Sequence, residues 1–179
     1  QDFRGFAGRI DGGVFKPGDR VKTLPSGFIT TIKTIELNGQ QIAEAFAPMS
    51  VTMTLQDEID TSRGDMIVRE NNSPEVGQDL EVLVTWMSSN PLRARTKVVI
   101  KHTTNQCMGM IKELKYKVDI NTLHRLQDID TLAMNDIGRI SLRTAKPLFY
   151  DVYKKNRQTG SLIIIDAQTN ETIGAGMII

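Results

Sequence analysis

The sequence has little cysteine, few aromatic residues and no long apolar run. Its single cysteine, Cys107, excludes an internal disulfide and is typical of a reducing, cytoplasmic compartment. No stretch reaches the ~18 consecutive apolar residues of a membrane span. A basic segment followed by an apolar one, the mark of a signal peptide, is not visible. Aromatic residues make up 6% of the chain and indicate no platform for stacking nucleic-acid bases.

An excess of one charge sign is also missing. The chain has 22 basic and 21 acidic residues, for a net charge of +1, which gives no strong reason to expect a polyanion partner. Three lysines lie close together at Lys112, Lys115 and Lys117. Strand alternation would place the last two beside Glu113 and Asp119 on an ordinary solvated face. We therefore expect neither a membrane nor a nucleic-acid partner.

Motifs for metal binding and catalysis are absent. His102, His124 and Cys107 lack the short paired spacings of a zinc site. No G-x-S-x-G motif occurs, although a spatial Ser/His/Asp triad stays open because sequence does not show it. The phosphate loop G-x-x-x-x-G-K-[ST] is missing, and we attribute the bare G-x-G at Gly174–Gly176 to strand packing. The sequence predicts no catalytic residue, no cofactor-binding residue and no metal ligand.

Short apolar-alternating segments separated by Gly, Pro, Asn and Asp dominate the chain, and they predict an all-β protein of the barrel or sandwich type. One tempting helical stretch, Ile120–Asp130, is equally compatible with a short 3₁₀ or irregular crossover. The expected strands lie near Phe3–Ile10, Asp19–Leu24, Phe28–Leu37, Ser50–Leu55, Asp65–Val68, Asp79–Trp86, Thr96–Lys101, Met108–Asp119, Ile137–Thr144, Leu162–Asp166 and Thr172–Ile178.

A polar, proline-containing segment at Glu70–Gly77 separates two sets of expected strands. We interpret it as a linker between a first domain at residues 1–72 and a second at residues 76–179, each with its own core. Trp86 opens the second domain and is expected to be buried. The methionines are expected to fill the interiors rather than form a binding face, including Met49, Met53, Met108 and Met110.

An acidic cluster precedes the last expected strand of the first domain. It has two interpretations. One is a functional loop that contacts a partner or binds a metal, and the other is a turn in which Asp60 or Thr61 accepts backbone hydrogen bonds and Arg63 offsets the acids. The turn is the favoured interpretation. The candidate contact residues are Asp57, Glu58, Asp60, Arg63 and Asp65.

The C-terminal wording, Gly160-Ser-Leu-Ile-Ile-Ile-Asp followed by Thr172-Ile-Gly-Ala-Gly-Met, resembles the large, GTP-binding subunit of bacterial ATP sulfurylase. The segment from Leu55 to Asp65, Trp86-Met, Asn90-Pro-Leu and the run Tyr116–Asn121 are similar to the same family. The motif Gly13-x-x-x-x-Gly18-Asp-x-Val is common to translational GTPases. The resemblance covers almost the whole chain.

This resemblance implies two consecutive barrels, a second-domain-like barrel of translation factors followed by an elongation-factor C-terminal-like Greek-key barrel. It implies a strand upstream of Asp2. The family's full complex makes adenylylsulfate and pyrophosphate from ATP and sulfate, coupled to GTP hydrolysis. Its GTP and magnesium would bind a GTPase domain that this sequence does not contain. Expected partners are that GTPase domain, the small catalytic subunit, and a fused or separate adenylylsulfate kinase.

Two other classes stay open. The chain could comprise barrels of an elongation factor that contact tRNA, but those usually end in a Thr-Val-Ala-Val-Gly-like strand, unlike Thr172–Met177. It could instead be an independent small enzyme on a Greek-key barrel, with a convergent polar cluster that sequence does not reveal. A phosphate-loop GTPase encoded upstream of Gln1 would decide between these classes.

Overall fold

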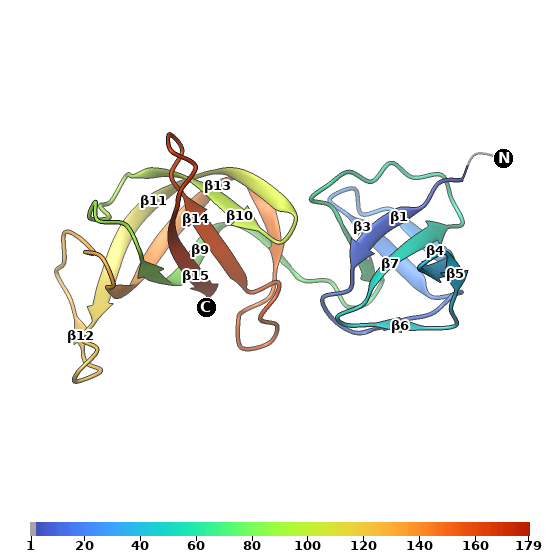
Figure 1. Ribbon diagram of the computed structural model, residues 1–179, viewed down its shortest axis with the longest axis horizontal. Coiled ribbons are helices and arrows are strands. Elements are labelled where there is room, and N and C mark those ends of the chain that lie inside the picture. The colour runs from blue at the N-terminus through green and yellow to red at the C-terminus, as the bar shows by residue number, and fades with distance from the viewer. Residues whose placement is uncertain (1–2) are drawn as a thin grey trace. The chain divides into compact units, whose positions relative to one another are not determined.

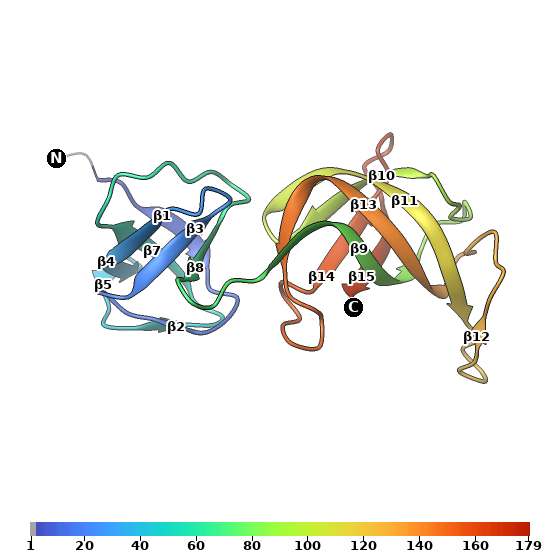
Figure 2. The same cartoon turned by 180° about the vertical axis from the view of Figure 1, so that it is seen from behind.

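The structure is a computed structural model that describes residues 3–179, and that range contains strands but no helix. The predicted all-β class is therefore confirmed. The strands gather into two compact units, Gln1–Pro74 and Glu75–Ile179 (Figures 1 and 2), which we describe separately. Nothing in residues 3–179 forms a helix of the length and hydropathy required to cross a bilayer.

Short strands make up the first unit, and they are β1 (Phe6–Arg9), β2 (Val14–Phe15), β3 (Arg20–Leu24), β4 (Ile29–Leu37), β5 (Gln40–Gln41), β6 (Ala45–Phe46), β7 (Ser50–Leu55) and β8 (Met66–Arg69). The main sheet is antiparallel and has the order β1-β7-β4-β3-β8, with β5 beside β4. Strands β2 and β6 form a separate pair. The strand that the resemblance implies upstream of Asp2 lies outside the described residues.

Alternating burial holds the first unit together. Along β7, Val51, Met53 and Leu55 point into the core while their neighbours are more exposed, as a half-buried strand requires. The core also contains fully buried Ile32 and Ile35 of β4. Burial of each such side chain stabilises the fold by roughly 1.5–3 kcal/mol.

A turn at Asn38-Gly39 joins β4 to β5. Both residues have positive φ angles, 50° and 79°. That combination belongs to the tight hairpin turn that matches the right-handed twist of its strands, and Asn-Gly is the favoured pair for it. The local sequence therefore fixes where β4 reverses.

Longer strands form the second unit, and they are β9 (Glu75–Trp86), β10 (Lys97–His102), β11 (Asn105–Val118), β12 (Arg125–Leu126), β13 (Ile137–Tyr150), β14 (Ser161–Ile165) and β15 (Thr172–Ile178). Neighbours follow the order β10-β14-β15-β9-β13-β11, and β11 also pairs with β10. The antiparallel ladder thus closes on itself into a barrel. The short β12 pairs only with the end of β11.

The second unit has its own core inside this ring. Trp86 is 3% exposed, so its predicted burial is confirmed, and its indole Nε1 donates a hydrogen bond to the Asn90 carbonyl oxygen at 2.7 Å. Aliphatic side chains from every strand of the ring surround it, among them Leu80, Ile100, Ile111 and Ile140. An aromatic ring with a satisfied polar atom suits such an interior.

The segment Ile120–Asp130 is not a helix. It consists of turns and the short strand β12, and Asp119 organises its start. The Asp119 carboxylate accepts hydrogen bonds from the backbone N–H groups of Asn121 and Thr122 at 2.8 and 3.3 Å. These bonds lower the pKa of Asp119 and replace the backbone pairing that a helix would have supplied. Of the two earlier interpretations, the irregular crossover is the correct one.

Candidate interaction surfaces

The acidic loop, residues 57–65, connects β7 to β8; its start is bonded to β4 and its end closes a turn. Asp57 Oδ2 accepts a hydrogen bond from the Thr30 hydroxyl at 2.8 Å. Asp65 Oδ2 accepts one from the Ser62 backbone N–H at 2.8 Å. Ile59 is buried in the core between them. The loop therefore has a defined position on the first unit.

The middle of the acidic loop projects its charges outward. Glu58 and Arg63 are exposed, and the Asp60 side chain is 96% exposed. Asp60 forms an ion pair with Arg4, so the cation that offsets it is Arg4 rather than the expected Arg63. The backbone hydrogen bond expected at Asp60 or Thr61 is instead accepted by Asp65. Exposed charge on an anchored loop can recognise a complementary surface.

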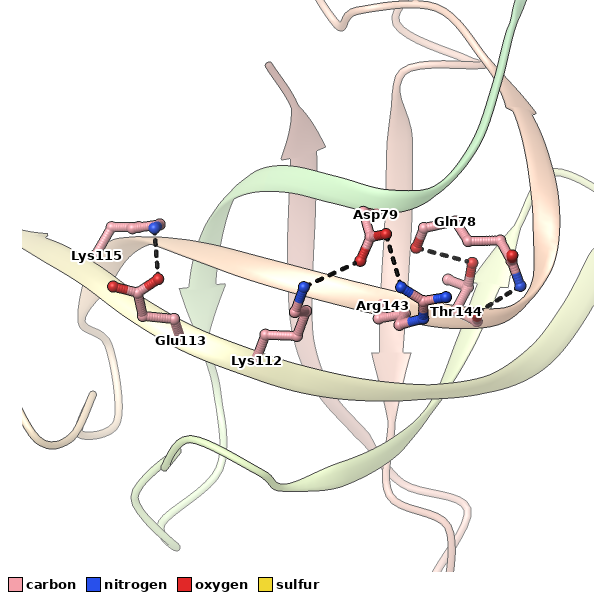
Figure 3. Close-up of polar contacts among 7 residues, drawn as sticks. All are labelled: Gln78, Asp79, Lys112, Glu113, Lys115, Arg143 and Thr144. Atoms are coloured by element: carbon pink, nitrogen blue, oxygen red, sulfur yellow. Dashed lines mark hydrogen bonds and ion pairs between the residues drawn. The ribbon is translucent and has the colours of Figure 1, made fainter.

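A charged face covers strands β9, β13 and β11 of the second unit (Figure 3). Asp79 of β9 accepts hydrogen bonds from Arg143 Nη1 at 2.9 Å and from Lys112 Nζ at 3.4 Å. Lys115 pairs with Glu113 on the same strand. This pairing raises the pKa of Lys115 through the hydrogen bond to the Glu113 carboxylate.

The three lysines of β11 therefore all have carboxylate partners. Lys117 Nζ lies 2.7 Å from Asp136 Oδ1, in addition to the pairs formed by Lys112 and Lys115. Each pair neutralises a cation that a nucleic-acid backbone would otherwise need. The predicted sharing of a face with Glu113 holds for Lys115, while the acid beside Lys117 is Asp136 rather than Asp119.

A groove of about 380 Å³ lies beside this charged face. We call it the methionine groove, and it is lined by Lys97, Met108, Gly109, Met110, Arg143, Thr144 and Ala145. Met108 is 45% exposed and Met110 is 38% exposed. Our expectation that these two methionines fill the barrel interior is wrong. They form the apolar floor of an outer surface, whereas Met53 is buried as expected.

The reason lies in the alternation of β11. Its inward positions are Cys107, Gly109 and Ile111, so the methionines between them must point outward. A Cβ at Gly109 would lie 2.8 Å from Cγ1 of Ile100 and 3.2 Å from Cδ1 of Leu142. The interior is full at this level and has no room for a methionine.

Binding of a metal ion by this chain depends on whether any described side chains are grouped as metal ligands. Across residues 3–179, no group of three or more His, Cys, Asp or Glu side chains is placed to hold an ion. His102 is buried, and its Nε2 lies 2.7 Å from the Thr159 carbonyl oxygen. Burial raises the pKa of the Cys107 thiol, which keeps it in its less reactive protonated form.

Comparison with known proteins places these barrels in a family. Residues 79–179 match the family described as GTP-eEF1A C-terminal domain-like, which covers most of the second unit. The chain belongs to this family. Crystal structures of sup35 complexed with GMPPNP and with GDP superpose with TM-scores of 0.87 and 0.85. They cover 97% of this chain and 42% and 43% of those chains at 14% identity, so they show a shared fold.

Curated relatives are more similar in sequence. Sulfate adenylyltransferase subunit 1 of Bacteroides fragilis is 44% identical over 178 residues, which are 99% of this chain and 37% of that protein. The bifunctional enzyme CysN/CysC of Mycobacterium tuberculosis is 45% identical over 180 residues, which are 100% of this chain and 29% of that protein. These matches confirm the resemblance seen in the sequence. The chain spans roughly a third of the length of these relatives.

Proposed function

We propose that this chain is the barrel portion of the GTP-binding subunit of a sulfate adenylyltransferase. The whole enzyme would convert ATP and sulfate into adenylylsulfate and pyrophosphate, coupled to GTP hydrolysis, in the cytoplasm. The observation that carries the proposal is identity of about 44% to subunit 1 over essentially the full chain. The two-unit, all-β architecture is consistent with it.

In this proposal the barrels are a scaffold and contribute no catalytic residue. GTP and magnesium would bind a GTPase domain outside this sequence, because a phosphate loop of backbone amides and a lysine is needed to hold the phosphates. Adenylyl transfer would take place on the small catalytic subunit. An adenylylsulfate kinase, fused or separate, would consume the product. The Mycobacterium tuberculosis relative is named as a bifunctional enzyme, CysN/CysC, which is consistent with a second activity on the same chain.

The acidic loop is the proposed contact with the small subunit. It carries exposed Glu58 and Asp60 on a loop held by the Asp57 hydrogen bond to Thr30 and by buried Ile59. A loop held in this way loses little conformational freedom when a partner binds. Exposed carboxylates at the rim would mainly speed association with a basic surface and would be sensitive to salt.

The test is affinity for the small subunit of the sulfate adenylyltransferase encoded in the same genome. The wild-type chain is expected to bind it in calorimetry, and the variant Glu58→Lys, Asp60→Lys is expected to bind about tenfold or more weakly. Glu44→Lys is the matched control, because Glu44 is also exposed on the first unit and pairs with Lys16 at 3.3 Å.

Two outcomes would count against the proposal in different ways. Absence of binding by the wild-type chain would remove the scaffold role for this partner. Unchanged affinity of the double variant, with a circular dichroism spectrum like that of wild type, would remove the acidic loop from the interface while leaving the scaffold role standing.

A further inference from the structure

We propose that the methionine groove of the second unit is a docking site for an extended acidic protein segment whose carboxylates alternate with apolar side chains. The inference does not rest on the sulfurylase assignment. It comes from the arrangement of charge and apolar surface across three neighbouring strands, and from where the paired cations lie.

The register of the sheet builds the groove. Met110 of β11 lies directly across from Lys97 of β10 on one side and from Arg143 of β13 on the other. One row of the outer surface therefore reads cation, apolar side chain, cation. A second row is apolar, since Met108 lies across from Val99, and Val99 lies across from Ile165 of β14. The two rows give a floor of apolar side chains, and cations flank its first row on both sides.

Charge complementarity selects an acidic occupant. Three cations, Lys97, Lys112 and Arg143, stand at or beside the groove, and Asp79 is the carboxylate that faces them. Asp79 is shared between Lys112 and Arg143 at 3.4 and 2.9 Å. Lys97 forms no ion pair with any residue in the described range 3–179. Figure 3 shows Asp79 shared between Lys112 and Arg143. One carboxylate for three cations leaves two positive charges uncompensated among the described residues.

The floor selects apolar side chains between the carboxylates. Methionine side chains are flexible and polarisable, so they adapt to different apolar groups, and exposed methionines are typical of peptide-binding surfaces. Gly109 and Ala145 also line the groove, and neither adds a large side chain to its outer surface. No aromatic side chain lines the groove, so it offers no stacking surface for a nucleic-acid base. A segment with alternating side chains presents one face every second residue and matches a strand surface.

Selective ¹³C labelling of the methionine methyl groups gives a site-resolved test on the full chain. The probe is a short peptide of alternating Glu and Leu, with alternating Lys-Leu and Glu-Ser peptides as matched controls. Saturable shifts are expected at Met108 and Met110 with the Glu-Leu peptide. The two control peptides are expected to bind about tenfold more weakly, because each lacks one of the two complementary features.

Substitutions on the outer face separate the contribution of the cations from that of the apolar floor. Lys97→Glu and Met108→Ser are each expected to reduce affinity for the Glu-Leu peptide about tenfold, because they remove a rim charge or part of the floor. Met134→Ser is the control, since Met134 is 54% exposed and does not line the groove. Its affinity is expected to equal that of wild type.

Several results would overturn the proposal. These are an absence of saturable shifts at Met108 and Met110, equal shifts at Met87 and Met134, and equal affinity for the Lys-Leu peptide. A single-stranded RNA oligomer that shifts Met108 and Met110 while the Glu-Leu peptide does not would assign the groove to nucleic acid instead. Loss of the circular dichroism signal in Lys97→Glu would be checked against Met108→Ser, which tests the same groove without changing charge.

Discussion

Gly176 of β15 lies diagonally across from Val82 of β9, and a side chain on Gly176 would occupy the space that Val82 fills. Met177 and Gly176 of β15 pair with Leu83 and Val84 of β9, which places Gly176 beside the inward-pointing Val82. A Cβ built on Gly176 would overlap Cγ1 of Val82 and lie 3.0 Å from Cδ1 of Leu162. The glycine is required by side-chain packing inside the barrel.

Gly176→Ala is therefore expected to destabilise the second unit by about 1–3 kcal/mol, because a β-branched neighbour in a filled core has no room to move. Urea unfolding followed through Trp86 fluorescence would measure the loss. Gly77→Ala is the control in the same strand system, because a Cβ there would make an ordinary 3.4 Å contact with the Tyr150 hydroxyl. Equal midpoints for the two variants would contradict this account of Gly176.

The sequence predicted the class of fold and most of the strands, because alternation and turn residues act locally. Ser50–Leu55 and Thr172–Ile178 match β7 and β15 at both ends. The glycines of Gly174–Gly176 were attributed to strand packing, and at Gly176 the close neighbours are the side chains of Val82 and Leu162. The two-residue strands β2, β5, β6 and β12 were missed, since so short a segment shows no periodicity.

Strand β13 shows what local patterns leave out. We expected it to end at Thr144, and Pro147, which cannot donate to a ladder, lies beyond that end. The strand continues to Tyr150, and the register against β9 shifts between Arg143 and Leu148. A bulge at this place absorbs the proline. Hydrogen bonds from Gln78 Nε2 to the Thr144 carbonyl and from Thr144 Oγ1 to the Lys146 carbonyl satisfy the interrupted backbone.

The methionine groove could not be predicted for a related reason. The strand that carries Met108 and Met110 was expected. The sequence did not show which of its two faces points into the core, because both faces are apolar near these residues. Only the packed interior around Gly109 decides which side chains point outward. The acidic loop was visible in sequence, whereas its partner Arg4, 56 residues away, was not.

An ion pair in the first unit gives a prediction for pH dependence. Arg69 Nη2 donates to Asp19 Oδ2 at 2.8 Å, and this hydrogen bond, together with one from the Lys16 backbone N–H, holds the pKa of Asp19 below its ordinary value. A carboxyl whose pKa is lower in the folded state adds stability above its unfolded pKa of about 3.9. That contribution is lost as the pH falls through the lower, folded pKa.

Arg69→Gln is expected to be less stable than wild type near neutral pH by no more than about 1 kcal/mol, because the pair is partly exposed. The difference should shrink below about pH 4, where Asp19 of the unfolded chain becomes protonated. Urea unfolding followed by circular dichroism over this range would show it. Arg69→Lys keeps the positive charge, so it should retain part of the stability that Arg69→Gln loses. A gap that stays constant down to the lowest pH would assign the effect to packing.

Nucleotide binding gives a prediction that separates this chain from the whole subunit. The sequence contains no phosphate loop, and its bare G-x-G is packed within β15 against β9. Calorimetry with GTP and magnesium, or with ATP and magnesium, is expected to show no saturable heat. A micromolar dissociation constant would reveal a nucleotide site that neither the sequence motifs nor the grooves of the barrels indicate.

The last prediction concerns the edge formed by β1. Phe6–Arg9 pairs with β7 on one side, and no other strand of the described residues pairs with it. Three of its four residues are exposed, so few contacts hold it in place. By contrast, β14 lies between β10 and β15 and carries buried Leu162 and Ile164. Local opening costs less where backbone pairs and apolar contacts are few.

Amide hydrogen exchange of Phe6–Arg9 is therefore expected to be much faster than that of Ser161–Ile165. Strand β7 is the internal control, because it lies in the same unit and pairs with both β1 and β4. Slow exchange in β7 with fast exchange in β1 would show fraying of the edge, whereas fast exchange in both would show opening of the whole unit. Such an edge can also recruit another chain, so light scattering is expected to detect weak self-association that Ala7→Lys reduces. A strict monomer in which β1 is protected as well as β14 would show that β1 is not an open edge in solution.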